Sequence, residues 1–192
     1  MAFIPGLLSP APYRFVMGPV GLRHPRPEDY EAWAKLRADS YSFLAPFEPE
    51  WPADDLDRSN YRLRLKRYQQ DISADFAYPF FIFLARERQL VGGINLSNIR
   101  RGVAQTATIG YWMGAPYAGQ GLMTHALRAV IHFAFSELFL HRLEAACLPE
   151  NEPSRRLLLR AGFEEEGYAR GYLKIAGRWQ DHRLFGLSRM DG

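Results

Sequence analysis

Two glycines that precede an apolar helix are the first residues of the chain with an evident chemical use. Gly119 and Gly121 follow an apolar stretch, and a helical pattern of apolar residues continues from Leu122. A glycine has no Cβ atom, so the backbone there can turn tightly and approach a ligand closely. The first turn of a helix leaves N–H groups without partners, and the helix dipole adds partial positive charge. The loop therefore suits a pyrophosphate, although two glycines can also form a tight loop and nothing more.

A second group of residues with chemical potential lies further along the chain. Asn151 stands just before an expected helix and Ser154 falls in its first turn, so on pattern alone Asn151 is a helix N-cap. Cys147 is the only cysteine of the chain. No histidine is placed locally to activate this thiol, so we expect a small core residue and not a nucleophile.

No residues of the chain show the spacing of a metal site. The helix after the glycines carries His125, Arg128 and His132 at positions i, i+3 and i+7, which resembles a metal-binding stripe. A solvated polar face explains this stripe better, and no Cys/His grouping has the spacing of a zinc site. We therefore expect no bound metal.

An acidic stretch in the first third of the chain contains no basic residue. Its acids are Glu48, Glu50, Asp54, Asp55 and Asp57. The ordinary interpretation is a solvated loop. The functional alternative is an acidic rim that receives a cationic substrate.

The elements that must position these residues follow from the hydrophobic pattern. The expected strands cover residues 16–23, 78–86, 90–99, 104–113, 141–148, 163–175 and 178–187. The expected helices cover 28–40, 56–70, 119–135 and 152–161, and Gly162 ends the last of them as a C′ glycine. Residues 46–52 hold three prolines and are not expected to form regular structure.

The order of these elements predicts a mixed α/β domain with a mainly antiparallel sheet. Strands 78–86 and 90–99 form a hairpin, and strands 163–175 and 178–187 form another about Ala176 and Gly177. The strand 104–113, the glycine loop, its helix and the strand 141–148 can pair their two strands only in parallel. We therefore expect seven strands with one parallel pair, flanked by about four helices.

Length and composition fit one folded domain. The chain has 192 residues, of which 47% are hydrophobic and 23% charged, and this size can bury a sizeable core. The net charge of +3, without a Lys/Arg block, argues against nucleic acid but is compatible with a polyanionic small ligand.

Location and domain limits follow from the same composition. No apolar run approaches the ~20 residues that span a bilayer. We expect residues 1–14 to be a flexible arm and not a signal peptide, and residues 15–190 to be one domain. A single cysteine excludes an intrachain disulfide and favours the cytoplasm.

Several motifs in a fixed order resemble the GNAT-type acetyltransferases over nearly the whole chain, from about residue 20 to residue 187. These motifs are Gly110-Tyr111-Trp112-Met113, Gly119-Gln120-Gly121, Asn151 with Ser154, and Ala161-Gly162-Phe163. Other segments look like the ribosomal-protein-alanine N-acetyltransferase branch of that superfamily. They are Phe43-Leu44-Ala45-Pro46-Phe47, Leu140-His141-Arg142-Leu143, Pro149-Glu150-Asn151, Gly167-Tyr168-Ala169-Arg170 and Trp179-Gln180-Asp181-His182.

The resemblance implies acetyl-coenzyme A as co-substrate, and a parallel strand pair that splays apart to admit its pantetheine arm. The implied cofactor-binding residues are Tyr111, Trp112, Met113, Ala118, Gly119, Gln120, Gly121, Leu122, Met123, Thr124, Asn151 and Ser154. The first three would contact pantetheine through their main chain, and the N–H groups from Ala118 to Thr124 would cradle the phosphates. Where the family's loop usually begins with Gln or Arg this chain has Pro116, so we expect weaker or reshaped cofactor binding, not its loss.

The candidate catalytic residues are Ser154 and Asn151, whose roles the resemblance implies, and Glu144 and Tyr172, which we consider for the proton of the amine. The Ser154 hydroxyl would act as general acid toward the departing thiolate, and Asn151 would position the cofactor arm. Glu144 is the leading candidate to take the proton of the attacking amine, and its alternative role is a paired surface carboxylate. Tyr172 is a weaker candidate for base or acid, and its alternative role is core packing.

The expected function is transfer of an acetyl group to a primary amine by direct attack in a ternary complex. The acceptor would be the α-amino group of a protein N-terminus, for example of a ribosomal protein. An α-amino group has a pKa of about 7.7–8.0, so a mild base or a water path suffices. The alternatives are a small amine (an antibiotic, polyamine or amino acid) as acceptor, or a non-catalytic coenzyme A-binding module. We expect neither nucleic acid nor membrane as partner, and a monomer or a homodimer.

Overall fold

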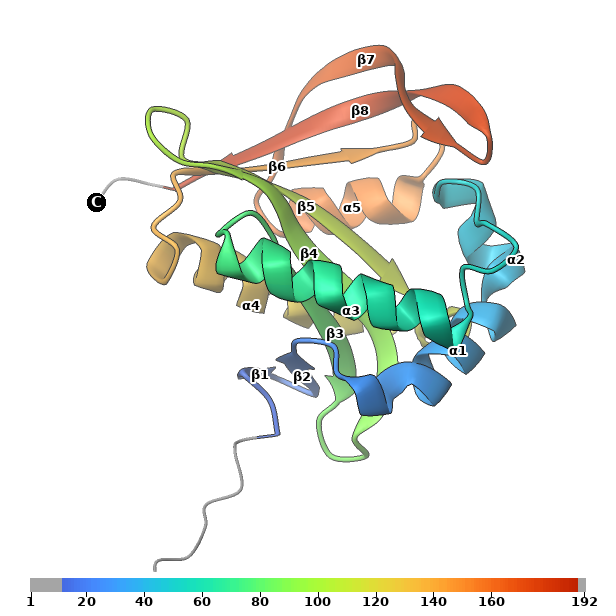
Figure 1. The fold of residues 1–192 in the computed structure, drawn as a ribbon. Coiled ribbons are helices and arrows are strands. Elements are labelled where there is room, and N and C mark those ends of the chain that lie inside the picture. Colours follow the sequence, from blue (N-terminus) through green and yellow to red (C-terminus); the bar gives the residue numbers. More distant parts are fainter. Residues whose placement is uncertain (1–11, 190–192) are drawn as a thin grey trace, which may run out of the picture.

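An eight-stranded sheet runs through residues 12–189, the part of the chain that the computed structural model describes (Figure 1). Its strand order is β1-β2-β3-β4-β5-β6-β8-β7. Every neighbouring pair is antiparallel except β5–β6, which is parallel. The predicted α/β class and single parallel pair are confirmed. The strands are β1 (Phe15–Met17), β2 (Val20–Arg23), β3 (Tyr78–Leu84), β4 (Gln89–Arg100), β5 (Thr106–Met113), β6 (Arg142–Cys147), β7 (Glu164–Ile175) and β8 (Arg178–Ser188).

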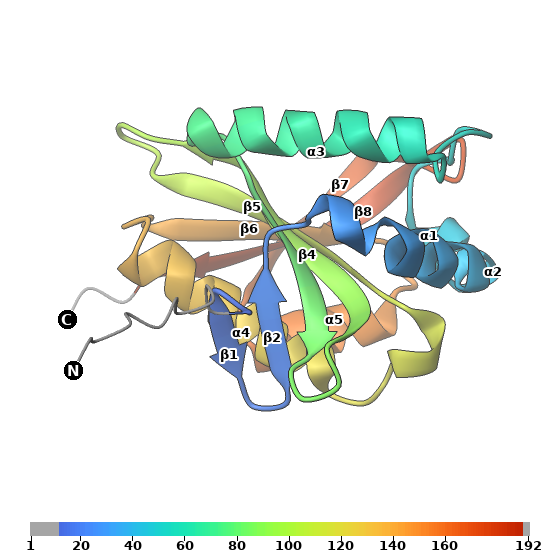
Figure 2. The same ribbon diagram turned by 60° about the horizontal axis from the view of Figure 1, so that its bottom comes forward.

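Helices cover both faces of the sheet. Helix α3 crosses one face, with α1 and α2 at one of its ends, and α4 and α5 lie on the opposite face (Figures 1 and 2). The helices are α1 (Tyr30–Asp39), α2 (Tyr41–Leu44), α3 (Arg58–Ser73), α4 (Leu122–Ser136) and α5 (Glu152–Arg160), and the 3-10 turns are η1 (Pro27–Asp29), η2 (Ala45–Phe47) and η3 (Ala115–Tyr117). Within residues 12–189 no helix is long and apolar enough to cross a membrane.

The count of seven strands is wrong by one, because the strand expected over residues 16–23 is a hairpin. Gly18 adopts a φ of +55° and Pro19 follows it, so the chain turns between Met17 and Val20, which are paired. Proline has no N–H to offer a strand partner, and a positive φ suits glycine. The result is two short strands, β1 and β2, in place of one.

The N-terminal arm expected over residues 1–14 falls mostly outside the described residues. Its last two residues are not loose. The N–H of Arg14 donates to the carbonyl of Leu22 at 2.8 Å, and the ring of Tyr13 lies 5.7 Å from that of Phe83. Tyr13 and Arg14 therefore contact the sheet.

Two helix predictions need correction. The four-residue helix α2 was not predicted, because a single turn is too short to show a 3.6-residue period. The helix expected from residue 119 starts at Leu122, because Gly121 has a left-handed φ of +77° and ends the preceding loop. Gly162 ends α5 with a φ of +95°, as predicted for a C′ glycine.

Side chains of the sheet alternate between two separate cores. Ile109 of β5 and Cys147 of β6 belong to the core beneath α4 and α5, whereas Trp112 packs against the core beneath α1 and α3. Because neighbouring side chains of a strand point to opposite faces, residues 109 and 111 face α4 and α5, and residues 108, 110 and 112 face α3. The same alternation places Glu144 of β6 on the α3 face.

Candidate active site

The parallel strands β5 and β6 separate after a short paired stretch, as the resemblance implied. Their register runs from Thr106–Arg142 to Thr108–Glu144 and then stops, although β5 continues to Met113 and β6 to Cys147. Beyond that point each strand stays bonded on its outer side, β5 to β4 and β6 to β8. Their facing edges therefore carry main-chain groups that no strand partner satisfies within the described part of the chain. We call the space between these edges the gap.

The glycine loop continues from the open end of the gap. Gly119 and Gly121 have φ angles of +76° and +77°, and nothing lies within 4 Å of a Cβ built at either position. Two of the N–H groups expected to form the cradle are bonded to nearby carbonyls. The N–H of Ala118 donates to the carbonyl of Ala115 at 3.3 Å, and that of Thr124 to the carbonyl of Gly121 at 3.0 Å. The N–H groups of residues 119–123 have no acceptor within residues 12–189 and stand at the N-terminus of helix α4, which begins at Leu122.

Pro116 fits the loop without loss of a needed hydrogen bond. It lies in the first turn of η3, where an N–H would have no intrahelical partner. Its carbonyl accepts a bond of 2.8 Å from Nε2 of Gln120, which closes the loop upon itself. Pro116 therefore shapes the entrance to the cradle and leaves the N–H groups of residues 119–123 in place.

Three polar side chains meet on the α4–α5 face of the gap. The hydroxyl oxygens of Tyr111 and Ser154 are 2.8 Å apart, and Ser154 also lies close enough to Cys147 to lower the pKa of its thiol. Burial raises the pKa of the Tyr111 phenol far above its usual range, against a smaller lowering by Ser154. A protonated phenol can donate to Ser154, which then keeps its own hydrogen for another acceptor.

Cys147 has the character of a core residue. It is 5% exposed, and burial raises the pKa of its thiol despite the opposing effect of Ser154. Because the thiolate is the reactive form, this environment disfavours a nucleophile.

Asn151 caps helix α5. Its Oδ1 accepts a bond of 3.1 Å from the N–H of Ser154, which confirms the N-cap interpretation. The cap holds the first turn of α5 and so fixes the position of the Ser154 side chain beside Tyr111. The side-chain amide of Asn151 retains its NH2 group as a donor.

The two proposed proton acceptors lie apart from Ser154. Glu144 is on the α3 face, at the closed end of the gap, and is paired with Arg100 at 3.2 Å and Arg142 at 3.3 Å. These two ion pairs agree with the alternative role considered for Glu144, that of a paired surface carboxylate. Tyr172 is about half exposed on β7, and its ring meets the buried His182 edge-on at 5.7 Å. The core packing considered for Tyr172 does not occur.

A cavity of about 720 Å³ lies on the α3 face, next to the gap. Trp112 reaches it from β5, beyond the last residue paired with β6. Other lining residues are Trp33 of α1, Trp51 of the segment after η2, Asp71 of α3 and Asn95 of β4. The gap thus has the Ser154 cluster on one face and a ligand-sized cavity on the other.

Sequence analysis did not find this cavity, because its walls come from segments far apart in the chain. Of its lining residues, sequence analysis named Trp112, for its main chain, and three acids of the acidic stretch, Glu48, Glu50 and Asp55. The acidic stretch lines part of the cavity. Glu48 and Asp55 are paired there with Arg37 at 2.6 Å and Arg64 at 2.8 Å, whereas Glu50 lines it as an exposed residue. A rim of unpaired acids is therefore not present at Glu48 and Asp55.

Metal ligands do not gather in the described residues. Across residues 12–189, no three His, Cys, Asp or Glu side chains are grouped so that they could hold a metal ion. Within the polar stripe on α4, Arg128 and His132 are exposed and His125 is half-buried.

Comparison with known proteins gives consistent results for most of the chain. A family model described as an acetyltransferase (GNAT) domain matches residues 20–164. The probable N-acetyltransferase YjcK of Bacillus subtilis is 37% identical over 172 residues, which cover 90% of this chain and 87% of the relative. The [ribosomal protein uS5]-alanine N-acetyltransferase of Escherichia coli is 36% identical over 165 residues, with 85% of each chain covered.

A solved structure of similar fold contains a coenzyme A species. Mycobacterium smegmatis RimJ in complex with CoA-disulfide superposes with a TM-score of 0.84 at 33% identity, covering 88% of this chain and 81% of that chain.

Proposed function

Since the chain belongs to the GNAT acetyltransferase family and is an N-acetyltransferase, we propose that it acetylates the α-amino group of a protein N-terminus from acetyl-coenzyme A. One observation carries the proposal: the gap opens after Thr108 and Glu144, between a hydroxyl cluster on one face and a cavity on the other. The acceptor class rests on the similarity to the uS5-alanine N-acetyltransferase of Escherichia coli. We further propose that residues 15–190 act as one domain in the cytoplasm.

The residues at the gap and loop fit a long thioester carrier. The free N–H groups of residues 119–123, with the dipole of α4, suit its pyrophosphate. The unpaired edge of β5 at Tyr111, Trp112 and Met113 suits the amides of its pantetheine arm, in the manner of an added strand. When bound, acetyl-coenzyme A supplies the acetyl group as a thioester.

Ser154 protonates the thiolate that leaves when the amine has attacked the acetyl carbonyl. Tyr111, kept protonated by burial, can donate to Ser154, and the Ser154 hydrogen is then free for the thiolate. Asn151 positions the hydroxyl through the cap of α5. A positioned acid of this kind contributes roughly 10²–10⁴-fold to a rate.

The amine reaches the gap from the cavity side. An α-amino group has a pKa of about 7.7–8.0, so a fraction of it is neutral near pH 7 and needs only weak assistance. Glu144 is our first candidate to receive the amine proton because it shares the cavity's face of the sheet at the closed end of the gap. Tyr172 is the second.

Acetyl transfer to defined amines tests the proposal. Release of free thiol from acetyl-coenzyme A is followed with peptides carrying a free N-terminus, the same peptides with a blocked N-terminus, and a panel of small amines. We expect turnover with free N-termini only. Equal or faster turnover with small amines would move the acceptor to that class, and no turnover with any amine would contradict the proposal.

A further inference from the structure

We propose that Arg37 is a positioning residue that locks one wall of the acceptor cavity to the end of strand β5. The wall is the segment of residues 48–52, which follows η2 and lines the cavity throughout. This inference rests on the proposed function, because it takes the cavity as the place where the acceptor binds.

Arg37 is the centre of a buried cluster. It lies in the last turn of α1, is 9% exposed, and donates from both terminal nitrogens to Glu48, at 2.7 and 2.6 Å. Its guanidinium carbon lies 3.9 Å from the ring centre of Trp51 and 5.0 Å from that of Trp112. Trp51 in turn donates from Nε1 to Glu48 at 2.8 Å. The Arg37 side chain thus contacts two residues of the wall, Glu48 and Trp51, and one residue of β5, Trp112.

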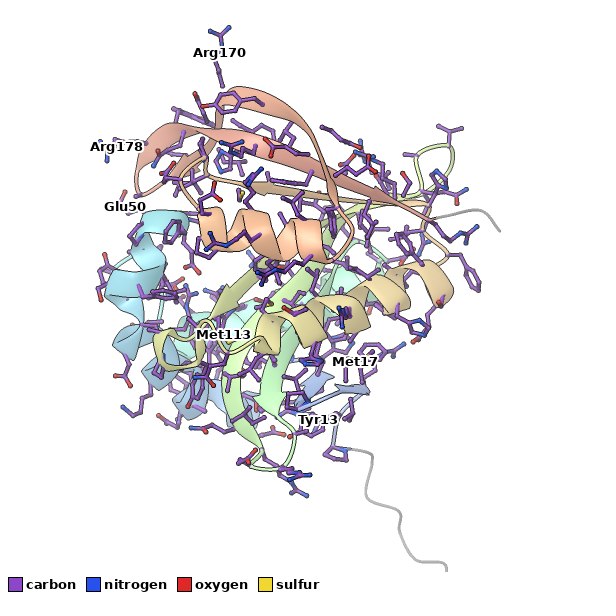
Figure 3. The ribbon with its side chains drawn as sticks, turned by 180° about the vertical axis from the view of Figure 1, so that it is seen from behind. Tyr13, Met17, Glu50, Met113, Arg170 and Arg178 are labelled. Atoms are coloured by element: carbon purple, nitrogen blue, oxygen red, sulfur yellow. The ribbon has the colours of Figure 1, made fainter. Side chains whose placement is uncertain are left out.

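The wall has little other support. It contains Pro49 and Pro52 and forms no helix or strand, so few main-chain hydrogen bonds fix it. A second anchor is the hairpin tip between β7 and β8, where the N–H of Ala176 donates to the carbonyl of Glu48 at 2.9 Å. Figure 3 shows Glu50 beside this tip, near Arg178, and Glu50 lies against Gly177. The wall therefore runs from α1 to the β7–β8 hairpin. Glu48 is held to α1 through its side chain and to the hairpin through its main-chain carbonyl.

The same turn of α1 is fixed to the strand end that leads into the glycine loop. The Oγ of Ser40, a residue with no exposed surface, accepts a bond of 2.9 Å from the N–H of Ala115. Leu36 occupies the space where a Cβ of Gly114 would be. The end of α1 therefore fixes residues 112–115 and the wall relative to each other. Through this contact, Arg37 sets the position of the acceptor relative to the thioester.

Arginine is required at this position by its shape. Its planar fork matches both oxygens of Glu48 while the same guanidinium lies over the rings of Trp51 and Trp112, whereas a lysine ammonium is a point charge that cannot form the two-pronged pair. Because Glu48 neutralises the charge, Arg37 does not repel a cationic amine in the cavity. Its role is geometric.

The variant Arg37→Lys tests this role against a matched control. Arg23 makes a similar two-pronged pair with Asp29, at 2.7 and 2.6 Å, and lies 4.4 Å from the ring centre of Phe83, but it does not line the cavity. We expect Arg37→Lys to raise KM for the acceptor peptide about tenfold, with KM for acetyl-coenzyme A within about twofold of the wild type. Arg23→Lys should lower the Tm comparably and leave both KM values unchanged. An equal rise of the acceptor KM in both variants, or a rise confined to acetyl-coenzyme A, would overturn the proposal.

Amide hydrogen exchange separates this inference from the proposed function, because it needs no acceptor. The N–H of Ala176, which donates to the carbonyl of Glu48, should exchange faster in Arg37→Lys than in Arg23→Lys or the wild type, while the N–H of Thr124, bonded to the carbonyl of Gly121, keeps its rate. If Arg37→Lys does not fold, Trp51→Phe replaces it, since it removes the bond to Glu48 and keeps an aromatic ring. Unchanged exchange at Ala176 would refute the lock even if acetyl transfer proceeds as proposed.

Discussion

The two sides of the gap are built in different ways. On the α4–α5 face, Ser154, Asn151 and the glycine loop are held by local backbone structure: a helix cap, a helix N-terminus and two left-handed glycines. On the α3 face, the cavity is enclosed by side chains from α1, α3, β4, β5 and the segment 48–52. The first side is fixed by residues close in sequence, and the second by contacts between distant segments.

This difference has a functional meaning. The face with local support is the one we assign to a carrier whose chemistry is always the same. The face assembled from distant side chains is the one we assign to the acceptor, whose identity differs among enzymes of related fold. A substitution on the first face should therefore alter turnover or carrier affinity, and one on the second should alter acceptor affinity.

The largest effect is expected on the carrier face from Ser154→Ala. Loss of the hydroxyl removes the proton donor to the leaving thiolate, so kcat should fall about 100-fold. The Kd for coenzyme A, measured by calorimetry, should change little, because the Asn151 cap accepts from the main chain of residue 154 and persists. An unchanged kcat would mean that the hydroxyl has no role in the reaction.

The glycine loop gives the next largest effect. In Gly121→Ala a Cβ enters the open space of the cradle, and the Kd for coenzyme A should rise about tenfold. Gly102→Ala is the matched control, since Gly102 also has a positive φ, +66°, and no atom within 4 Å of a built Cβ. Both variants should lose roughly 1 kcal/mol of stability from the strained backbone. Equal coenzyme A affinity in the two variants would contradict a phosphate site at Gly121.

A smaller effect is expected from Tyr111→Phe. This change keeps the ring and removes the hydroxyl 2.8 Å from Ser154. Ser154 then loses its fixed donor and its hydrogen can rotate, so kcat should fall by roughly 3- to 10-fold, the value of one neutral hydrogen bond. A loss as large as that of Ser154→Ala, measured by initial rates, would make Tyr111 the acid instead.

The smallest effect on turnover is expected from Cys147→Ala, within about twofold of the wild type. Its pH effect is on stability. Burial raises the pKa of the folded thiol, whereas the unfolded thiol loses its proton near pH ~8.5, so the folded state binds more protons above that pH. The free energy of unfolding in urea should therefore decline above pH ~8.5, and decline less in Cys147→Ala. A large loss of turnover in Cys147→Ala would instead indicate that Cys147 is a nucleophile in the reaction.

Much of the fold could be predicted because its elements are long and locally patterned. The two hairpins of the sheet, the parallel pair around the glycine loop and the end of α5 at Gly162 all follow from turn residues and hydrophobic period. The β1–β2 turn was missed although Gly18 and Pro19 signal a turn, because the strands on either side are only three and four residues long and show little alternation of their own. Helix α2 was missed because four residues carry no period.

The candidate site likewise has a part that local sequence patterns could predict and a part that they could not. Asn151, Ser154 and both loop glycines lie within short motifs, so sequence spacing could place them. The cavity could not be predicted, because the pairing of Arg37 with Glu48 and its stacking on Trp51 and Trp112 depend on the tertiary path of the chain. The faces of β6 were also unassigned from the sequence, and they separate Glu144 from Ser154.

A crystal structure with coenzyme A bound tests the central claim most directly. The account predicts the pantetheine arm in the gap, bonded to the main chain of residues 111–113, with the phosphates against the N–H groups of residues 119–123 and the sulfur beside Ser154. Coenzyme A bound elsewhere, with β5 and β6 still separated and their facing edges unpaired, would contradict it.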